Sequence, residues 1–488
     1  MKVAISYPPL EPAPGIPLLS QNRQFQWFSS PTYIYPVVPA TAATLLQSRG
    51  YQVLWDDGIA AEKSYSAWLE NIVSAAPDLI AMETKTPVVK RHWAIIDELK
   101  RRLPETRLVL MGDHVTALPE ESMECSAVDF ILTGGDYDFQ LLGLCDFLSE
   151  KRDVLPPGVW YREDDQIRDT GPFQLDHDLN SLSMIDRDLT RWQLYSEKNG
   201  NFRRTPGAYV MAGRDCWHHK CTFCSWTTIF PNWRTRSPEQ VLDEIGHLIE
   251  QHGVREIMDD TGTFPVGEWL HMFCAEMIER GYNRQVTLDC NMRFAALSED
   301  EYRLMKEAGF RLLLFGLESA NPETLKRVSK GIAVEQIVNS CKAARAAGLY
   351  PHVTIMFGYP WESYEDAMNT LNLGRELLIK GHAYTVQATI VIPYPGTPLF
   401  EECRANGWLK TMDWNRYDMR DPVMKTPMTD EQVKKLVQGI YNVAFNPEFL
   451  ARRLFSVRGW DDMQYFWRAG KKVMGHLVDF GAQNKACG

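Results

Sequence analysis

The N-terminal part of the chain alternates short apolar runs with amphipathic stretches. Five apolar runs have the length of buried strands, at residues 2–9, 51–58, 78–86, 107–114 and 128–135. The stretches at 41–50, 65–76 and 92–103 carry apolar residues at helical spacing. Alternating strands and helices are typical of a parallel α/β sheet. We predict a doubly wound, flavodoxin-like (Rossmann-type) domain over residues 1–150, with any ligand at the carboxyl ends of its strands.

A second alternation of the same kind begins near residue 206. Its six apolar runs lie at residues 207–216, 254–264, 285–294, 311–319, 350–360 and 384–398. One intervening helix is marked by Ser237 as its N-cap, Gln240 closing a capping box and Gly253 at its end. Six strand–helix units are too few for an eight-unit barrel, so residues 206–410 are predicted to form a partial (β/α)6 barrel.

Two other regions lack this alternation. Residues 151–205 are polar, rich in turn residues and poorly periodic, so we predict a linker that packs on its neighbours. Residues 411–488 favour helices and are predicted to form a small helical C-terminal domain. Aromatic residues at helical spacing more often pack in a core than line a pocket. Four of them are nevertheless candidates for substrate contacts: Trp460, Tyr465, Phe466 and Trp467.

Composition and charge narrow the class of protein. The chain is 45% hydrophobic and 24% charged, as in ordinary globular proteins. A net charge of −11 at pH 7 argues against nucleic-acid binding, which needs a basic face. No apolar run approaches the ~18–20 residues of a membrane span, and we find no secretory signal. We therefore expect a cytoplasmic protein whose 10 cysteines are reduced.

Three of the cysteines lie close together in the stretch RDCWHHKCTFCSW. Reduced cysteines at this spacing point to a metal. Cys216, Cys221 and Cys224 could hold zinc, with His218 or His219 as the fourth ligand. They fit a cubane iron–sulfur (4Fe-4S) cluster better, because such a cluster needs only three cysteines and leaves one iron open to a cofactor. Three buried cysteines without a ligand are the remaining alternative.

The cysteine loop and the residues after it resemble a known family. A three-cysteine loop after the first strand of a six-unit α/β series, with CTFCSW followed by RTRSPEQVLDEI, is similar to the radical S-adenosylmethionine (radical SAM) superfamily. The order of the two domains resembles its cobalamin-binding branch, and the resemblance covers about residues 1–410. The family usually has one residue fewer between the first two cysteines than the four found here, Trp217 to Lys220. The longer loop makes His218 and His219 candidates for a specific role.

The resemblance implies a binding site for S-adenosyl-L-methionine (SAM) at the strand ends of the second domain. The stretch MDDTGTF resembles the family's segment beside the methionyl amino group, here Asp259, Asp260 and Thr261. Arg293 is expected to pair with the cofactor carboxylate, and Glu318 to lie in the cofactor site. The family's element beside the adenine is matched by two residues, Gly358 and Pro360. Strand-end caps, a surface ion pair and a plain turn are the alternative roles of these residues.

The resemblance also implies a cobalamin site at the strand ends of the N-terminal domain. Its residues would be Gly112, His114, Val115 and Thr116 in the pocket, Thr84, Lys85 and Thr86 facing the lower side of cobalt, and Gly134 and Gly135 admitting the nucleotide tail. The chain lacks the Asp-x-His-x-x-Gly signature of a cobalt-ligating histidine. We therefore expect cobalamin with its base displaced and no protein imidazole on cobalt. Alternatively, His114 is a histidine satisfied within its loop, or the domain binds nothing.

For the activity, the resemblance implies a cobalamin-dependent radical SAM methyltransferase. It would transfer the methyl group of methylcobalamin to an unactivated carbon of a small molecule or of a protein or peptide side chain. An enzyme that cyclises, contracts or oxidises its substrate without net methylation is the alternative, and a non-catalytic corrinoid or cluster sensor is another. An electron donor such as a flavodoxin or ferredoxin is the expected partner. The candidate catalytic residues are Tyr394, after the last predicted strand, His218 and His219.

Overall fold

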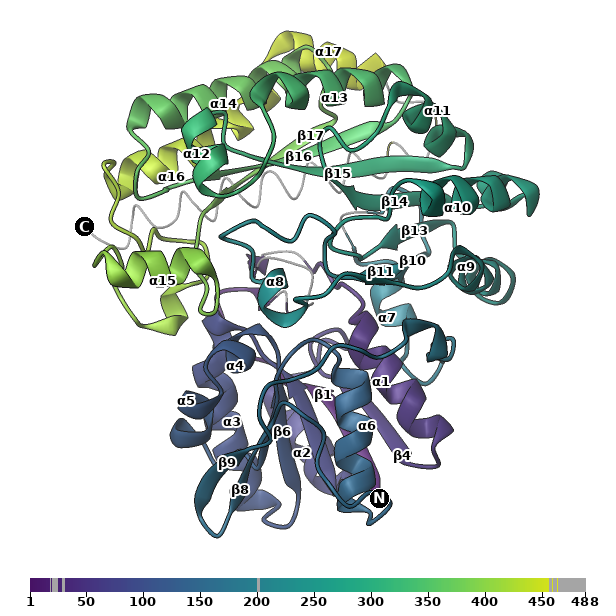
Figure 1. Cartoon of the computed structure of the whole chain (residues 1–488), viewed down its shortest axis with the longest axis vertical. Coiled ribbons are helices and arrows are strands. Elements are labelled where there is room, and N and C mark those ends of the chain that lie inside the picture. Colours follow the sequence, from purple (N-terminus) through teal and green to yellow (C-terminus); the bar gives the residue numbers. More distant parts are fainter. Residues whose placement is uncertain are drawn as a thin grey trace.

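The two alternating series form two α/β domains, which lie at opposite ends of the long axis of the molecule (Figure 1). The structure is a computed structural model that describes residues 1–17, 19, 25–28, 31–199, 202–455, 459 and 463. Within these ranges, no helix is long and apolar enough to cross a membrane.

The first domain is built on a sheet with the strand order β4-β1-β5-β6-β7-β8-β9. Its strands are β1 (Lys2–Tyr7), β4 (Gln52–Asp57), β5 (Leu79–Glu83), β6 (Arg107–Met111), β7 (Phe130–Leu132), β8 (Val159–Glu163) and β9 (Gln166–Asp169). The strands from β4 to β7 in this order pair in parallel, as in a flavodoxin-like sheet. The predicted fold of this domain is confirmed.

Helices cover both faces of this sheet, so Val3, Ala4 and Ile5 at its centre are fully buried. The helices are α1 (Val37–Ser48), α2 (Tyr65–Ala75), α3 (Val89–Arg102), α4 (Asp113–Ala117), α5 (Pro119–Cys125) and α6 (Tyr137–Leu148). Smaller elements are β2 (Ile16–Pro17), β3 (Trp27–Phe28) and the 3-10 turn η1 (Thr86–Val88).

Strands β8 and β9 lie in the segment that we predicted to be a linker. They form an antiparallel hairpin that extends the sheet beyond β7. Its turn consists of Asp164 and Asp165, both with positive φ (49° and 61°), as a two-residue hairpin turn requires. Most residues of both strands are partly or fully exposed, so their alternation of apolar and polar residues is weak. Residues 159–169 of the predicted linker therefore extend the first sheet.

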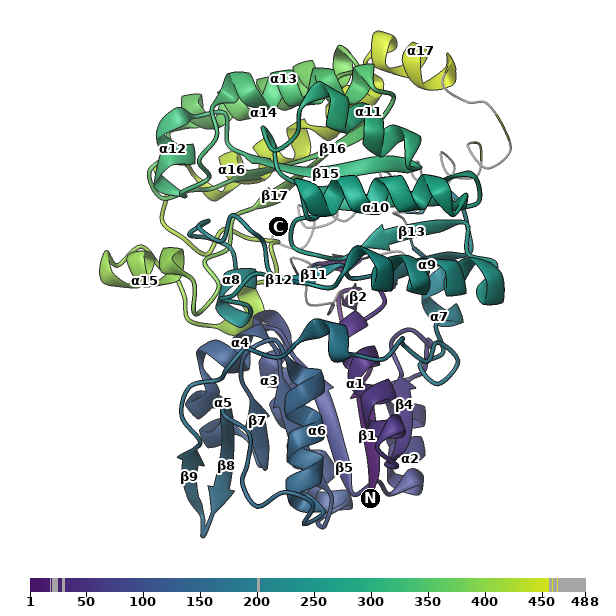
Figure 2. The ribbon, with the colours of Figure 1, turned by 45° about the vertical axis from the view of Figure 1, so that its right-hand side comes forward.

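The second domain is built on a parallel sheet in the order β10-β13-β14-β15-β16-β17. Its strands are β10 (Gly207–Val210), β13 (Glu256–Asp259), β14 (Thr287–Met292), β15 (Phe310–Glu318), β16 (Tyr350–Phe357) and β17 (Thr385–Ile390). Its helices are α9 (Pro238–His252), α10 (Glu268–Glu279), α11 (Glu299–Glu307), α12 (Pro322–Arg327), α13 (Val334–Ala346), α14 (Tyr364–Ile379) and α15 (Pro398–Ala405). The helices α9 to α14 lie outside the curved sheet (Figure 2), which confirms the predicted partial (β/α)6 barrel.

Helix α9 begins and ends where the sequence predicted. The Ser237 hydroxyl accepts a hydrogen bond from the Gln240 amide, and Gly253 ends the helix with φ 61°. The predicted capping box is wrong in its second half. The Gln240 side chain donates to the Asn180 carbonyl, and the Ser237 N–H donates to the Asn180 side chain, so Asn180 replaces the reciprocal contact.

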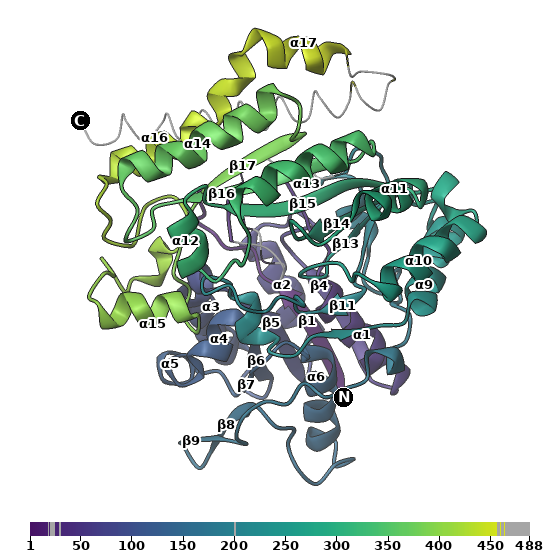
Figure 3. The same cartoon turned by 45° about the horizontal axis from the view of Figure 1, so that its top comes forward.

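The C-terminal region is helical only after residue 429. Helix α16 (Asp430–Gly439) packs on β17 and α14, and α17 (Pro447–Phe455) follows (Figure 3). Residues 411–429 contain the 3-10 turn η4 (Trp414–Arg416) and no α-helix. The candidate substrate-contact residues Trp460, Tyr465, Phe466 and Trp467 lie outside the described residues.

Candidate functional site

Segments that follow the carboxyl ends of strands in the two parallel sheets contact each other. Helix α4, which follows β6, packs on α8 (Trp226–Ile229), which lies in the cysteine loop. Gly396, which follows β17, has no room for a side chain, because a Cβ would lie 2.8 Å from that of Ala117 and 2.6 Å from Thr228. Ligands of parallel α/β sheets bind at strand carboxyl ends. The interface between the domains is therefore the candidate site.

The three cysteines lie on one loop whose two ends are joined. The short strands β11 (Gly213–Arg214) and β12 (Arg234–Thr235) pair antiparallel and enclose residues 215–233. All three loop cysteines are half-buried free thiols: Cys216, Cys221 and Cys224. The three predicted cluster ligands therefore lie on one closed loop. Within the described residues they do not form a group placed to hold a metal ion, and their role as cluster ligands stays a prediction.

Ionisation of Cys221 and Cys224 needs a nearby positive charge. Burial raises the pKa of Cys224 to about 12. Burial also raises the pKa of Cys221, although the Lys330 ammonium and the Arg293 guanidinium lower it. Cys216 Sγ lies 2.8 Å from Thr263 Oγ1. A metal centre supplies the charge that turns buried thiols into thiolate ligands.

Two basic residues and one acidic residue meet beside the cysteine loop. Glu318, at the end of β15, is buried with φ 64° and accepts a hydrogen bond from Lys330 Nζ at 2.7 Å. Arg293, after β14, donates to the carbonyl oxygens of Lys330 and Gly331. This set can bind both charged groups of an α-amino acid, the ammonium on Glu318 and the carboxylate on Lys330 and Arg293. The sequence predicted Glu318 and Arg293 but missed Lys330, which follows α12 without a motif of its own.

The residues of MDDTGTF differ in the contacts that they make. Asp259 accepts hydrogen bonds from the amides of Ala212 (2.7 Å) and Thr261 (3.0 Å), and burial raises its pKa to about 7. The Thr261 hydroxyl accepts from the Gly213 amide at 2.9 Å. These contacts are those of the strand-end cap that was the alternative to a cofactor role. Asp260 is buried at the interface, and its predicted role stays a prediction.

Two buried tyrosines of the second domain differ in their partners. Tyr394, a candidate catalytic residue, donates a hydrogen bond to the Tyr417 carbonyl at 3.1 Å. The Tyr359 hydroxyl has no hydrogen-bond partner among the described residues, although its side chain is fully buried. It lies between Gly358, with φ 99°, and Pro360, which were predicted to lie beside the adenine. A buried hydroxyl without a protein partner can still hydrogen-bond a water molecule or a ligand.

The two loop histidines each contact a neighbouring residue. His218 Nε2 donates to the Ser329 carbonyl at 2.8 Å, between α12 and α13. His219, with φ 49°, contacts the buried Asp215, which has φ 79°. Through His218, the longer loop therefore contacts the segment between α12 and α13, in the strand–helix unit of β15.

The predicted cobalamin loops of the first domain are tied together. A Cβ at Gly112, which has φ 135°, would lie 2.0 Å from the Thr84 carbonyl oxygen, so only glycine fits there. The Thr116 hydroxyl donates to the Gly112 carbonyl at 2.7 Å and accepts from the Gly134 amide at 3.1 Å. The remaining side chains of these loops are buried: Lys85, Thr86 and Val115.

His114 is enclosed by its own surroundings. Its Nδ1 lies 3.1 Å from the Thr86 hydroxyl, and its Nε2 lies 3.2 Å from Glu121 Oε2. The Trp414 ring packs edge-on against it, with centroids 5.3 Å apart, and also donates to Glu121. Both ring nitrogens thus have protein partners, as the alternative of a satisfied loop histidine predicted.

The paired glycines have a packing role. A Cβ at Gly134 would lie 2.6 Å from the Phe173 ring, and one at Gly135 would lie 2.1 Å from the Phe230 ring. The space that we expected to admit a nucleotide tail is therefore next to two aromatic rings. A tail can enter there only if these rings move, and the predicted contact stays a prediction.

A buried acid that the sequence analysis did not single out lies beside the same loops. Glu83, at the end of β5, accepts a hydrogen bond from the Tyr7 hydroxyl at 2.6 Å. Burial raises the pKa of Glu83 to about 8, opposed by Tyr7 and Lys85 and reinforced by Asp113 and Asp260. Asp260 follows β13, so acidic groups of both domains share the interface. At neutral pH Glu83 is largely protonated and can donate a hydrogen bond.

Comparison with known proteins places the chain among radical enzymes. Residues 211–374 match the family model described as the radical SAM superfamily. The chain is 30% identical over 412 residues to an uncharacterized methyltransferase of Pyrococcus horikoshii, covering 83% of this chain and 86% of the relative. It is 24% identical over 382 residues to an anaerobic magnesium-protoporphyrin IX monomethyl ester cyclase of Cereibacter sphaeroides, covering 76% of this chain and 60% of the relative.

Two solved structures share the fold of both domains. The radical S-adenosylmethionine methyltransferase TsrM from Kitasatospora setae, with cobalamin and a [4Fe-4S] cluster bound, matches with a TM-score of 0.70 and 15% identity, over 98% of this chain and 99% of that chain. The cobalamin-dependent S-adenosylmethionine radical enzyme OxsB, with aqua-cobalamin and S-adenosylmethionine bound, matches with a TM-score of 0.69 and 13% identity, over 98% of this chain and 72% of that chain.

Proposed function

Because the chain belongs to the radical SAM superfamily, we propose that it is a cobalamin-dependent methyltransferase acting on an unactivated carbon. The observation that carries the proposal is the contact between the two domains. The cysteine loop of the second domain packs, through α8, on the strand-end helix α4 of the first. A site for SAM cleavage and a site for a methyl donor would then open onto the same substrate. The fold of TsrM, a methyltransferase, supports this assignment over nearly the whole chain.

The chain's own residues would hold and orient the cofactors. Three cysteines would hold the cluster: Cys216, Cys221 and Cys224. Glu318 would take the ammonium of SAM, and Lys330 and Arg293 its carboxylate. Bound there, the cluster supplies one electron for SAM cleavage, and a corrinoid in the first domain supplies the methyl group. The corrinoid would rest on the loops of Thr84 and Gly112, while His114, with both nitrogens engaged, stays off the cobalt.

Product analysis tests the proposal. The protein is reconstituted anaerobically with iron, sulfide and hydroxocobalamin, then given SAM, a reductant and substrate. Candidate substrates come from comparing a deletion strain with its parent, in metabolites and in proteins, for molecules that lack one methylene mass. S-adenosylhomocysteine together with 5′-deoxyadenosine is the result that the proposal expects. A Cys224→Ser variant is the control and should form no 5′-deoxyadenosine.

A cyclase or oxidase is the second candidate, because one relative is named a cyclase. It predicts 5′-deoxyadenosine without substrate-dependent S-adenosylhomocysteine, from protein that holds a corrinoid. A sensor predicts neither product. The proposed substrate classes are a small molecule and a protein or peptide side chain, and the proposed partner is a flavodoxin or ferredoxin as electron donor.

A further inference from the structure

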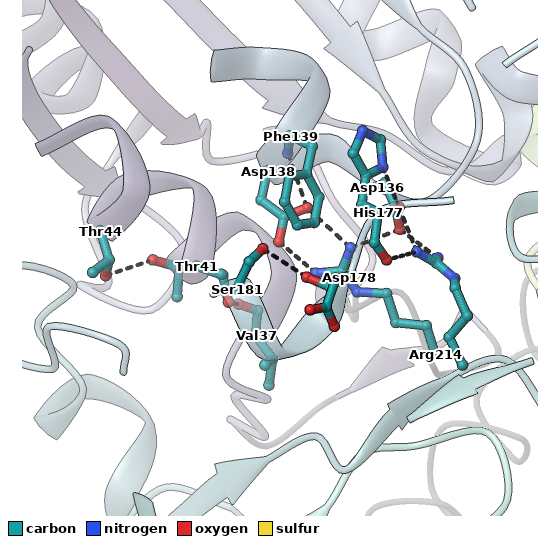
Figure 4. A network of polar contacts seen from close by, with 12 residues as sticks. Val37, Thr41, Thr44, Asp136, Asp138, Phe139, His177, Asp178, Ser181 and Arg214 are labelled. Carbon is teal, nitrogen blue, oxygen red and sulfur yellow. Dashed lines mark hydrogen bonds and ion pairs between the residues drawn. The ribbon is translucent and has the colours of Figure 1, made fainter. Parts of the chain in front are cut away.

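A buried ion cluster joins the base of the cysteine loop to the first domain (Figure 4). Asp136 Oδ1 accepts hydrogen bonds from Arg214 Nη1 (2.6 Å) and Arg234 Nη2 (2.8 Å). Asp136 Oδ2 accepts from Arg234 Nη1 (2.8 Å) and lies 2.8 Å from His177 Nδ1. Asp138 accepts from both terminal nitrogens of Arg214. Asp136 and Asp138 are 0% exposed and Arg214 is 3% exposed.

The cluster compensates a repulsion at the base of the loop. Arg214 and Arg234 lie directly opposite each other in the β11–β12 pair, which closes the loop. Like charges in this position destabilise a strand pair. Burial raises the pKa of Asp136, but Arg214, His177 and Arg234 outweigh burial and hold that pKa well below its ordinary value. The loop is thus closed by a carboxylate that comes from the other domain.

The same segment of the first domain contacts the loop at a second point. Asp136 lies between β7 and α6, directly after Gly134 and Gly135. Gly135 admits the ring of Phe230, which is fully buried and belongs to the cysteine loop. One short segment therefore contacts both the base of the loop and the residue that follows α8.

We propose that Asp136 is a positioning residue, which fixes the cysteine loop at one distance from the strand ends of the first domain. Asp138 supports Asp136, because it accepts hydrogen bonds from the same Arg214 guanidinium. This inference rests on the proposed function, in which groups held by the two domains act on one substrate carbon. In such a reaction a misplacement of about 1 Å can cost about 100-fold in rate.

Matched variants test the role of Asp136. Asp136→Asn keeps the size of the side chain and removes its charge. Asp138→Asn removes the charge of the second carboxylate that binds Arg214, and leaves Asp136 in place. Glu256→Gln is the control, because Glu256 is a fully buried carboxylate that accepts from Arg311 at 2.7 Å, at the amino end of β13. If Asp136→Asn does not fold, Asp138→Asn carries the test.

Hydrogen–deuterium exchange of the reconstituted protein is the first measurement. We expect the amides of residues 213–235 to exchange about tenfold faster or more in Asp136→Asn, less so in Asp138→Asn, and at the wild-type rate in Glu256→Gln. Unchanged exchange of this segment in both aspartate variants would overturn the proposal, and so would equal acceleration in the control.

Pulsed EPR gives the distance itself. In protein loaded with hydroxocobalamin and then reduced, dipolar coupling between the cluster and cob(II)alamin should give one narrow distance distribution in the wild type. Asp136→Asn should broaden or shift this distribution while iron and corrinoid contents stay equal, and a distribution identical to the wild type contradicts the proposal. If the wild type takes up no corrinoid, the proposed function fails, whereas the exchange measurement still decides whether Asp136 positions the loop.

Discussion

Glu318 Oε1 and Lys330 Nζ lie 2.7 Å apart, and both side chains are almost fully buried. Each charge compensates the other, so neither is left alone in a medium of low polarity. A ligand with an ammonium and a carboxylate can exchange with this pair, since it offers each residue a new partner of the right sign. Under the proposed function, the pair would be a site for the amino-acid end of SAM that is stable before its ligand arrives.

Removing either charge of this pair should weaken SAM binding. Glu318→Gln and Lys330→Met should each cost about 1–3 kcal/mol of binding free energy, because a buried charge-assisted contact is lost. Iron content should not change. Calorimetric titration of reconstituted protein with SAM measures the effect, with Glu299→Gln as the control because that side chain is exposed. Equal affinities in all proteins would show that the ion pair lies outside the SAM site.

The reconstituted protein should bind about four iron and four sulfide per chain. The brown absorbance should vanish in Cys216→Ala, Cys221→Ala and Cys224→Ala. His218→Ala should retain the iron, because that histidine donates to a backbone carbonyl. Metal and sulfide analysis checks this, and one tightly held zinc with no iron is the contradicting result.

Protein produced with cobalamin should hold about one corrinoid per chain, as expected for a single site at the strand ends of the first domain. Its spectrum should be base-off, and His114→Ala should leave the cobalt ligation unchanged, since both nitrogens of His114 have protein partners. Visible absorption and EPR of the cob(II) form measure this. A protein-derived nitrogen on cobalt that disappears in His114→Ala would refute the assignment.

Stability should fall as the pH rises through the neutral range. The pKa of Glu83 is raised from its ordinary value of 4.5 to about 8, so between these values the folded protein holds a proton that the unfolded chain has released. Asp57, with a pKa of about 6, and Asp259, with a pKa of about 7, act in the same direction. The Tm should therefore be lower near pH ~8.5 than near pH ~6.

Glu83→Gln isolates this effect. It keeps a neutral acceptor for the Tyr7 hydroxyl, and should stabilise the protein by about 1 kcal/mol or more at alkaline pH, since one pKa unit corresponds to about 1.4 kcal/mol. Thermal unfolding across the pH range measures it, with the exposed Glu105→Gln as the control. An unchanged pH profile in Glu83→Gln would assign the dependence to other groups.

Local patterns predicted the two domains and their order. The buried strands are continuous apolar runs, and caps such as Ser237 and Gly253 mark a helix within a few residues of its own ends. The hairpin at Asp164–Asp165 was missed because its strands are short and mostly exposed. The sequence feature that marks the hairpin is the pair of successive aspartates, which form the turn and adopt positive φ.

Pairs between distant residues account for most of what the sequence missed at the site. Tyr7 and Glu83 are 76 positions apart, and Arg214 and Asp136 are 78 apart. No local motif marks any of these residues in its own segment. Only the packing of the strands brings the partners together. The three cysteines could be predicted because they lie close together in one short stretch of the sequence.

The hairpin of β8 and β9 decides which strand lies at the edge of the first sheet. Without it, β7 would expose an unpaired backbone between apolar side chains, which is a template for a strand of another molecule. The actual edge strand, β9, is short and polar, and its Arg168 forms an ion pair with Glu163 at 2.9 Å. A chain cut near residue 150 should therefore self-associate through β7, whereas the intact chain presents the short, polar β9 at this edge.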